Sequence, residues 1–104
     1  MSNSEILLSI CVPTYNRQFL LERNVSFHLE RFRELQVPFE IVLVDDCSTD
    51  NTAAYIQSLE GIPEINAYRR VKNSGFVSNY AFAMRRARGR YAVFLGDDDL
   101  LIPE

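Results

Sequence analysis

Two apolar runs in this chain each end in a cluster of carboxylates. Residues 41–44 (IVLV) run into two consecutive aspartates, and residues 91–96 (YAVFLG) run into three. Short runs of β-branched and aromatic residues bounded by turn residues are typical of buried parallel strands. In open α/β sheets, ligands bind in the crevice beyond the carboxyl ends of such strands. The sequence therefore predicts a binding crevice that gathers Asp45, Asp46, Asp97, Asp98 and Asp99.

These five carboxylates restrict what the crevice can bind. At low dielectric they would repel one another strongly unless a positive charge neutralised them. The simplest neutralising partner is a hard divalent cation, held by carboxylate oxygens and bridging to phosphates. We therefore expect a divalent-cation site at this end of the sheet.

Strand-like and helix-like segments alternate along the whole chain. The expected strands are 6–12, 39–44, 65–71 and 91–95, and the expected helices are 20–35, 50–59 and 76–88. Pro13 is expected to end the first strand, Asp50 to cap the second helix, and Gly89 to cap the end of the third. The β-α-β-α-β-α-β order predicts an α/β fold with an open parallel sheet of about four strands and helices on both faces.

Composition places the chain among single-domain globular proteins. Its 104 residues suit one small domain, and a net charge of −3 gives no global reason to bind nucleic acid. The basic stretch at residues 85–90 is interpreted as cations at a helix C-terminus. Cys11 and Cys47 are expected to be free thiols in a reducing compartment. With neither a signal peptide nor a spanning segment, we expect a cytoplasmic protein, with work at the inner face of the membrane left open.

Two turn segments each admit a functional and a structural interpretation. Residues 13–16 (PTYN) offer a hydroxyl, an aromatic face and an amide that suit a flat heterocycle, or else form a turn in which Asn16 caps the next helix. Residues 73–75 (NSG) precede a helix whose free N–H groups suit an anion, or else form a plain turn. Because side chains alternate along a strand, one of the paired aspartates should reach the crevice. His28 is expected to pack in the core or at its boundary and not to act in catalysis.

Taken together, these segments resemble the nucleotide-binding half of the family 2 glycosyltransferases, which have the GT-A fold. The matching stretches are 9–17, 40–52, 73–75, 87–91 and 94–99, with Pro103 beyond them. They cover nearly the whole chain, in the family's order and spacing. The resemblance implies strand order 3-2-1-4 and a Rossmann-like GT-A half-domain over residues 1–104.

The resemblance also implies site residues. Thr14 and Tyr15 would line the base pocket, Asp46 would bind the base with support from Asp45, and Asp97 would meet the ribose. Asp98, with Asp99 as a second candidate, would hold Mn²⁺ or Mg²⁺ against the diphosphate. The implied nucleotide-binding residues are Pro13, Thr14, Tyr15, Asn16, Asp45, Asp46, Asn73, Gly75 and Asp97.

The expected activity is transfer of a sugar from a nucleotide-sugar donor to a sugar or lipid-linked acceptor in surface polysaccharide or glycoconjugate assembly. Two residues depart from the common family pattern: Gly96 replaces the first motif aspartate, and Asn79-Tyr80 looks like a subgroup that transfers deoxysugars. The catalytic residues are unknown, because the general base is expected beyond Glu104. We therefore expect a fragment, inactive in transfer alone, that self-associates as a homodimer through the open 91–95 edge.

Two other classes of protein share parts of this pattern. A phospho-accepting receiver domain also places an aspartate pair after an apolar strand, although there it follows the first strand and is accompanied by a lysine missing here. A non-catalytic nucleotide-binding module is the other alternative. Phosphotransfer from acetyl phosphate would favour the receiver domain, and binding of a nucleoside diphosphate with Mn²⁺ would favour the other two readings.

Overall fold

The computed structural model describes residues 5–102, so the expectations for Pro103 and Glu104 lie outside the described residues. Seven elements follow one another in the order β1 (Leu8–Thr14), α1 (Gln18–Leu35), β2 (Phe39–Asp45), α2 (Thr52–Ser58), β3 (Ile65–Arg69), α3 (Phe76–Arg86) and β4 (Tyr91–Phe94). The alternation of strands and helices predicted from the sequence is confirmed.

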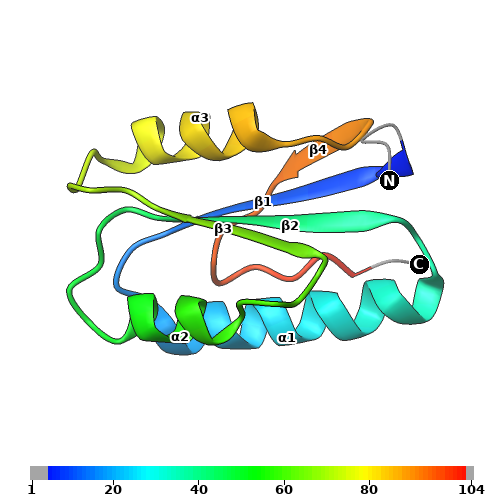
Figure 1. Cartoon of the computed structure of the whole chain (residues 1–104), viewed down its shortest axis with the longest axis horizontal. Helices are drawn as coiled ribbons and strands as arrows, with labels where there is room; N and C mark the ends of the chain where they lie inside the picture. The colour runs from blue at the N-terminus through cyan, green and yellow to red at the C-terminus, as the bar shows by residue number, and fades with distance from the viewer. Residues whose placement is uncertain (1–4, 103–104) are drawn as a thin grey trace.

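The four strands form one parallel sheet in the order β3-β2-β1-β4, as the family resemblance implied. Helices α1 and α2 cover one face of this sheet and α3 covers the other (Figure 1). In the register of β1 with β2, Thr14 lies opposite Asp45, so the two strands end at the same level. Strand β4 lies at an open edge, and the self-association expected there stays a prediction.

The core explains why the apolar runs became strands. Every residue of β2 is buried, because helices cover both faces of this inner strand. On the α1 side, Ile10, Ile41 and Leu43 pack against Leu21 and Val25 of the helix. On the α3 side the buried cluster is smaller, and its members are Cys11, Val42, Val44 and Ala83. Cys11 is a buried free thiol and Cys47 a half-buried one, as predicted.

Strand β1 continues through Pro13, so the prediction that this proline ends the strand is wrong. Backbone bonding alternates along β1: Leu95 donates its N–H to Cys11 O (3.0 Å), and Asp46 donates to Thr14 O (3.0 Å). The nitrogen of Pro13 therefore lies on the β4 side, at a level beyond the end of β4. No ladder hydrogen bond is lost there, and proline is tolerated.

Gly89 does not cap α3. The helix ends at Arg86, with Ala87 as its extended C-cap. Instead, Gly89 donates its N–H to Ser9 Oγ (2.8 Å), and a Cβ at this glycine would lie 2.9 Å from the backbone nitrogen of Ser9. The glycine is needed because the chain passes so close to β1.

The other helix and strand ends differ from prediction by a few residues. Helix α2 begins at Thr52, whose N–H donates to Asp50 Oδ1 (2.9 Å), so the expected bond forms although Asn51 is the N-cap. Strand β3 ends at Arg69 and β4 at Phe94, each before the predicted end. None of the helices within residues 5–102 has both the length and the apolar character needed to cross a bilayer.

Candidate functional site

A cleft of about 540 Å³ opens at the carboxyl end of the sheet. It lies where β1 and β2 end, beside the first turn of α3 and the loop after β4. Its lining residues are Pro13, Thr14, Tyr15, Arg17, Asp46, Asn73, Gly75, Phe76, Asn79, Gly96, Asp97 and Asp98. The structure thus brings together most of the site predicted from the sequence, and leaves Asn16, Asp45 and Asp99 outside the lining.

Asp46 is fixed in the cleft wall by the turn before α3. Its two carboxylate oxygens accept the N–H groups of Ser74 and Gly75, each at 2.9 Å. This chain's own carboxylate therefore occupies the donors of Ser74 and Gly75, and the anion site expected at the first N–H groups of the following helix stays a prediction. Gly75 has φ +88°, a left-handed conformation that glycine adopts without strain. A carboxylate has about four acceptor positions, so Asp46 keeps about two for a ligand.

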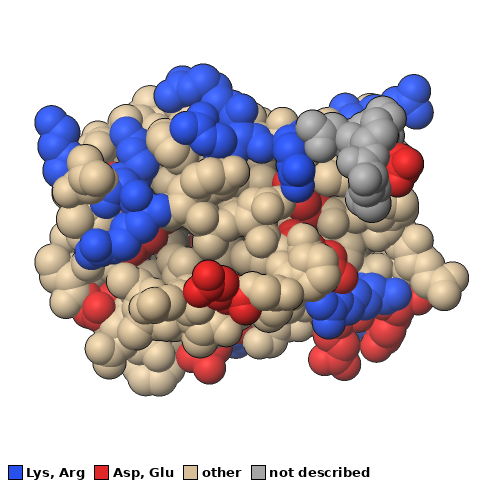
Figure 2. Space-filling view, in the orientation of Figure 1, with Lys and Arg blue, Asp and Glu red and all other residues tan. Residues whose placement is uncertain are grey.

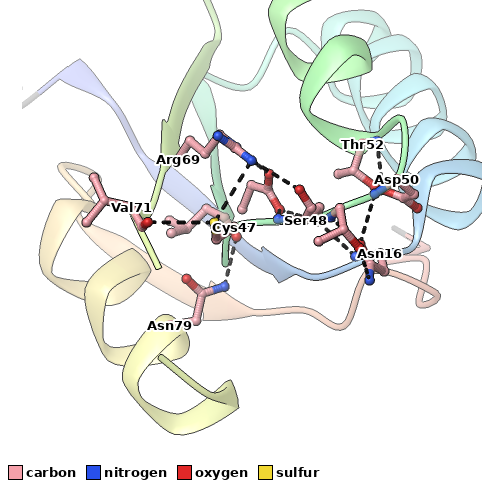
Figure 3. A network of polar contacts seen from close by, with 11 residues as sticks. Asn16, Cys47, Ser48, Asp50, Thr52, Arg69, Val71 and Asn79 are labelled. Atoms are coloured by element: carbon pink, nitrogen blue, oxygen red, sulfur yellow. Dashed lines mark hydrogen bonds and ion pairs between the residues drawn. The ribbon is translucent and has the colours of Figure 1, made fainter. Parts of the chain in front are cut away.

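Asp45 points away from the cleft, as the alternation of side chains along β2 requires. It is fully buried, accepts bonds from the backbone N–H (3.2 Å) and the hydroxyl of Ser48, and receives Arg69 Nε at 3.4 Å. Arg69 also donates to Ser48 O (3.1 Å) (Figure 3). Asp45 therefore shapes the loop after β2, and its supporting role toward the base stays a prediction.

Asn16 joins the loop after β1 to the loop after β2. Its Oδ1 accepts the backbone N–H groups of Thr49 (2.8 Å) and Asp50 (3.3 Å), and its own N–H donates to Ser48 Oγ (2.9 Å) (Figure 3). Helix α1 has Arg17 as its N-cap, with no side-chain capping bond. Asn16 is thus neither a helix cap nor a cleft residue, contrary to both interpretations from the sequence.

The loop after β4, which we call the acidic loop, carries Asp97, Asp98 and Asp99 in different environments. Asp97 is only 12% exposed, accepts the Thr14 hydroxyl at 2.9 Å, and lies 3.9 Å from Arg17 Nη1. Burial raises the pKa of Asp97, and the Thr14 bond and the Arg17 charge oppose that rise. Asp98 and Asp99 are both exposed, and of these two only Asp98 lines the cleft.

Gly96 leaves the space into which those exposed carboxylates turn. A Cβ at this position would meet Asp99 Oδ2 at 2.9 Å and Asp98 Oδ1 at 3.1 Å. The carboxylates of Asp98 and Asp99 therefore occupy the space that a side chain at position 96 would take.

Two polar residues on α1 form hydrogen bonds with the backbone of the acidic loop and of Leu101, which follows it. Asn24 Nδ2 donates to Gly96 O (3.2 Å) and Asp99 O (2.8 Å), and His28 Nε2 accepts the N–H of Leu101 (2.9 Å). Because Nε2 accepts, Nδ1 carries the proton toward Asn24 O, 2.8 Å away. Burial lowers the pKa of His28, which favours this neutral form. The predicted core packing of His28 is confirmed.

The bonding role of Asn24 and His28 was not predicted from the sequence. One signal was available: Asn24 and His28 lie four residues apart on the buried face of an amphipathic helix. Polar side chains there need partners, because an unpaired buried polar group is costly.

Three of the five aspartates already have partners within this chain. Its donors form hydrogen bonds to Asp45, Asp46 and Asp97, so repulsion among the five does not by itself demand a cation. Within residues 5–102, no three His, Cys, Asp or Glu side chains converge on a metal-sized site. Mg²⁺ is commonly held by one or two carboxylates together with substrate phosphates and water. The remaining exposed carboxylates fit a cation of that kind.

The sequence model described as glycosyl transferase family 2 matches residues 9–104. A Bacillus subtilis (strain 168) protein, named provisionally as a teichuronic acid biosynthesis glycosyltransferase, is 37% identical over 100 residues. That match covers 95% of this chain and 38% of the relative. The GalNAc(5)-diNAcBac-PP-undecaprenol beta-1,3-glucosyltransferase of Campylobacter jejuni is 36% identical over 98 residues, covering 91% of this chain and 30% of that protein. The chain spans about a third of the length of these relatives.

Solved structures share the same fold. The crystal structure of Staphylococcus aureus TarS in complex with UDP-GlcNAc aligns with a TM-score of 0.78 at 28% identity, covering 91% of this chain and 27% of that chain. A mannosyltransferase from Pyrobaculum calidifontis, in complex with GDP-Man and Mn²⁺, aligns with a TM-score of 0.75 at 27% identity. This second alignment covers 89% of this chain and 28% of the mannosyltransferase.

Proposed function

The chain belongs to glycosyl transferase family 2, and from this premise we propose that its cleft binds the nucleotide part of a nucleotide-sugar donor. The proposed reaction is transfer of a hexose or deoxysugar to a sugar or lipid-linked acceptor in surface polysaccharide or glycoconjugate assembly. Residues 1–104 would supply donor and metal binding.

One observation carries the proposal: three prepositioned acceptor or aromatic groups line the same cleft. Asp46 is held by two backbone N–H groups and faces the cleft, where it would accept a base imide N–H. Asp97 is held by the Thr14 hydroxyl and would accept a ribose hydroxyl. Tyr15 lines the cleft and is 42% exposed, which leaves an aromatic face for the base to stack on.

Phosphate recognition would use the acidic loop after β4 together with Arg17. Asp98, with Asp97 or Asp99, would hold Mn²⁺ or Mg²⁺, and Arg17 supplies a fixed positive charge in the same cleft. When bound, such an ion acts as a Lewis acid that offsets the charge of the leaving nucleoside diphosphate. This chain's residues place the donor and keep its diphosphate beside these charges.

The relatives narrow the choice of ligands for testing. The TarS complex contains UDP-GlcNAc and the mannosyltransferase complex contains GDP-Man with Mn²⁺, so uridine and guanosine diphosphates are the first candidates. The receiver-domain alternative fails, because Asp45 is buried against Arg69 and the chain's family is a different one. A non-catalytic nucleotide-binding module would have the same cleft. Only an assay of sugar transfer distinguishes it from a transferase.

Calorimetric titration with UDP, GDP, TDP and CDP, each with and without Mn²⁺, tests the proposal. We expect one or two of these ligands to bind, and binding to strengthen with Mn²⁺. Asp50→Asn is a matched control, because it removes an exposed carboxylate that does not line the cleft. If folded protein binds none of the four nucleotides under either condition, the proposal fails.

A further inference from the structure

Positive charge is concentrated in one part of this acidic chain. Residues 65–96 contain seven Lys or Arg and no Asp or Glu, whereas the other residues contain four Lys or Arg and all fourteen acidic residues. Those residues form β3, α3 and β4, so the charge gathers on the α3 side of the sheet. Figure 2 shows Lys and Arg along the side of the molecule where α3 lies, and most Asp and Glu toward the α1 and α2 side.

Four of the seven cations form an exposed set, which we name the basic face: Lys72, Arg85, Arg86 and Arg90. Within residues 5–102, no carboxylate lies within ion-pair distance of these four. Arg86 is held over the ring of Phe82, with its guanidinium carbon 4.1 Å from the ring centroid. Two further arginines of this segment pair with buried carboxylates: Arg69 with Asp45, and Arg88 with Glu40.

Large apolar side chains are exposed beside these cations. Val71 is 95% exposed, Val77 75% and Phe76 62%. They lie in the loop before α3 and in the first turn of α3. Exposed aliphatic and aromatic groups next to cations are typical of surfaces that enter the headgroup region of an anionic bilayer. A nucleic-acid backbone would use the cations but gives Val71 and Val77 nothing to contact.

We propose that the basic face and its apolar neighbours dock on an anionic lipid bilayer. Each Lys or Arg held near such a surface strengthens binding by about fivefold. The net charge of −3 opposes any general attraction to an anionic surface, so docking is directed by this face alone. Phe76 belongs both to this surface and to the cleft lining, so docking brings the cleft mouth to the bilayer. Docking itself does not depend on the proposed function. If the cleft binds a donor as proposed, docking would also bring that donor close to a lipid-linked acceptor, and this consequence alone rests on the proposed function.

Vesicle co-sedimentation tests the docking. We expect the chain to sediment with vesicles of phosphatidylcholine mixed with phosphatidylglycerol, to stay in solution with phosphatidylcholine alone, and to be released as salt rises. The double variant Arg85→Glu/Arg90→Glu should weaken binding at least about tenfold. Arg23→Glu/Arg31→Glu is the matched control, because it reverses two exposed arginines on α1, on the other side of the sheet. It should leave binding unchanged.

The apolar part is tested separately by Val71→Ser/Val77→Ser, which should reduce the binding that survives at high salt. Equal binding to neutral vesicles, or equal losses in the α1 control, would overturn the proposal. So would tighter binding to duplex DNA than to the anionic vesicles. Salt-sensitive oligomers that disappear in Arg85→Glu/Arg90→Glu would assign this face to the acidic side of a second copy. Nucleotide titration of the same variants shows whether the cleft is intact, so failure of docking and failure of the proposed function remain distinguishable.

Discussion

The two ends of the sheet both bury carboxylates, but they use them differently. At the amino end, Glu40 is 1% exposed and accepts Ser9 Oγ (2.6 Å) and Arg88 N (2.7 Å) on one oxygen. Its other oxygen accepts Asn66 Nδ2 (2.8 Å) and Arg88 Nε (3.3 Å). At the carboxyl end, Asp46 accepts two bonds from the residues that the structure describes, both from backbone N–H groups, and faces an open cleft.

The difference separates a structural carboxylate from one available to a ligand. Glu40 uses all of its about four acceptor positions within the chain, so it has none left for another molecule. Asp46 and Asp97 use some of their acceptor positions in bonds that hold them in place. Their other acceptor positions face the cleft. Burial alone therefore does not identify a functional carboxylate, and unused acceptor positions facing a cleft are the better criterion.

The largest effect expected is on stability, at the amino end. Glu40→Ala removes the buried carboxylate that binds Ser9, Asn66 and Arg88, and should lower the free energy of unfolding by about 3–5 kcal/mol. Glu40→Gln should lower it less, because an amide keeps the shape and one acceptor. Urea unfolding measures both values. Nucleotide affinity of the folded fraction should stay unchanged, and a large loss there would show that the two ends are not independent.

The next largest effect is expected from His28, which links α1 to the residue that follows the acidic loop. His28→Leu removes the acceptor of the Leu101 N–H, which should cost about 1–3 kcal/mol of stability and also weaken Mn²⁺-dependent nucleotide binding. His28→Gln should restore much of the binding, because its amide oxygen can accept the same N–H. Val25→Ala is the control, since Val25 is equally buried on the same helix and its side chain packs in the apolar core. If Val25→Ala reduces metal-dependent binding as much, then His28 has no specific role in placing the loop.

A smaller stability effect but a clear binding effect is expected at Asp98. Asp98→Asn keeps the shape and removes the charge, so Mn²⁺-assisted nucleotide binding should fall at least about tenfold, or ~1.4 kcal/mol. Asp99→Asn should reduce it less, because Asp99 does not line the cleft. Titration calorimetry compares the two variants. Equal losses would contradict the assignment of Asp98 as the principal ligand.

The smallest effect expected is a pH-dependent change at Asp97. Burial raises the pKa of Asp97 in the folded chain, so its stabilising contribution is present at low pH and is lost as pH rises through that raised pKa. Asp97→Asn lacks this loss, so its stability relative to the native chain should increase as pH rises from the acid range toward neutral. Thermal unfolding at several pH values measures the difference. A relative stability that falls over the same pH interval would reverse the assigned sign.

Local patterns were enough to predict the elements and the cleft, because strand and helix periodicities depend on neighbouring residues. The family resemblance supplied the strand order, and alternation along a strand predicted that one of the two paired aspartates faces the cleft. Neither could show that Ser74 and Gly75 donate to Asp46, nor that Asn24 reaches the loop at Asp99. Those bonds join residues 28 to 75 positions apart, so they depend on how the helices pack on the sheet.

Paramagnetic broadening by Mn²⁺ tests the central claim most directly. With a nucleoside diphosphate present, the amide signals of Gly75, Gly96 and Asp98 should broaden first. Those of Arg88 and Gly89, at the amino end of the sheet about 20 Å away along β1, should stay sharp. The Asp98→Asn variant should remove the selective broadening. Broadening centred on Arg88 and Gly89, or spread evenly over the chain, would contradict the account.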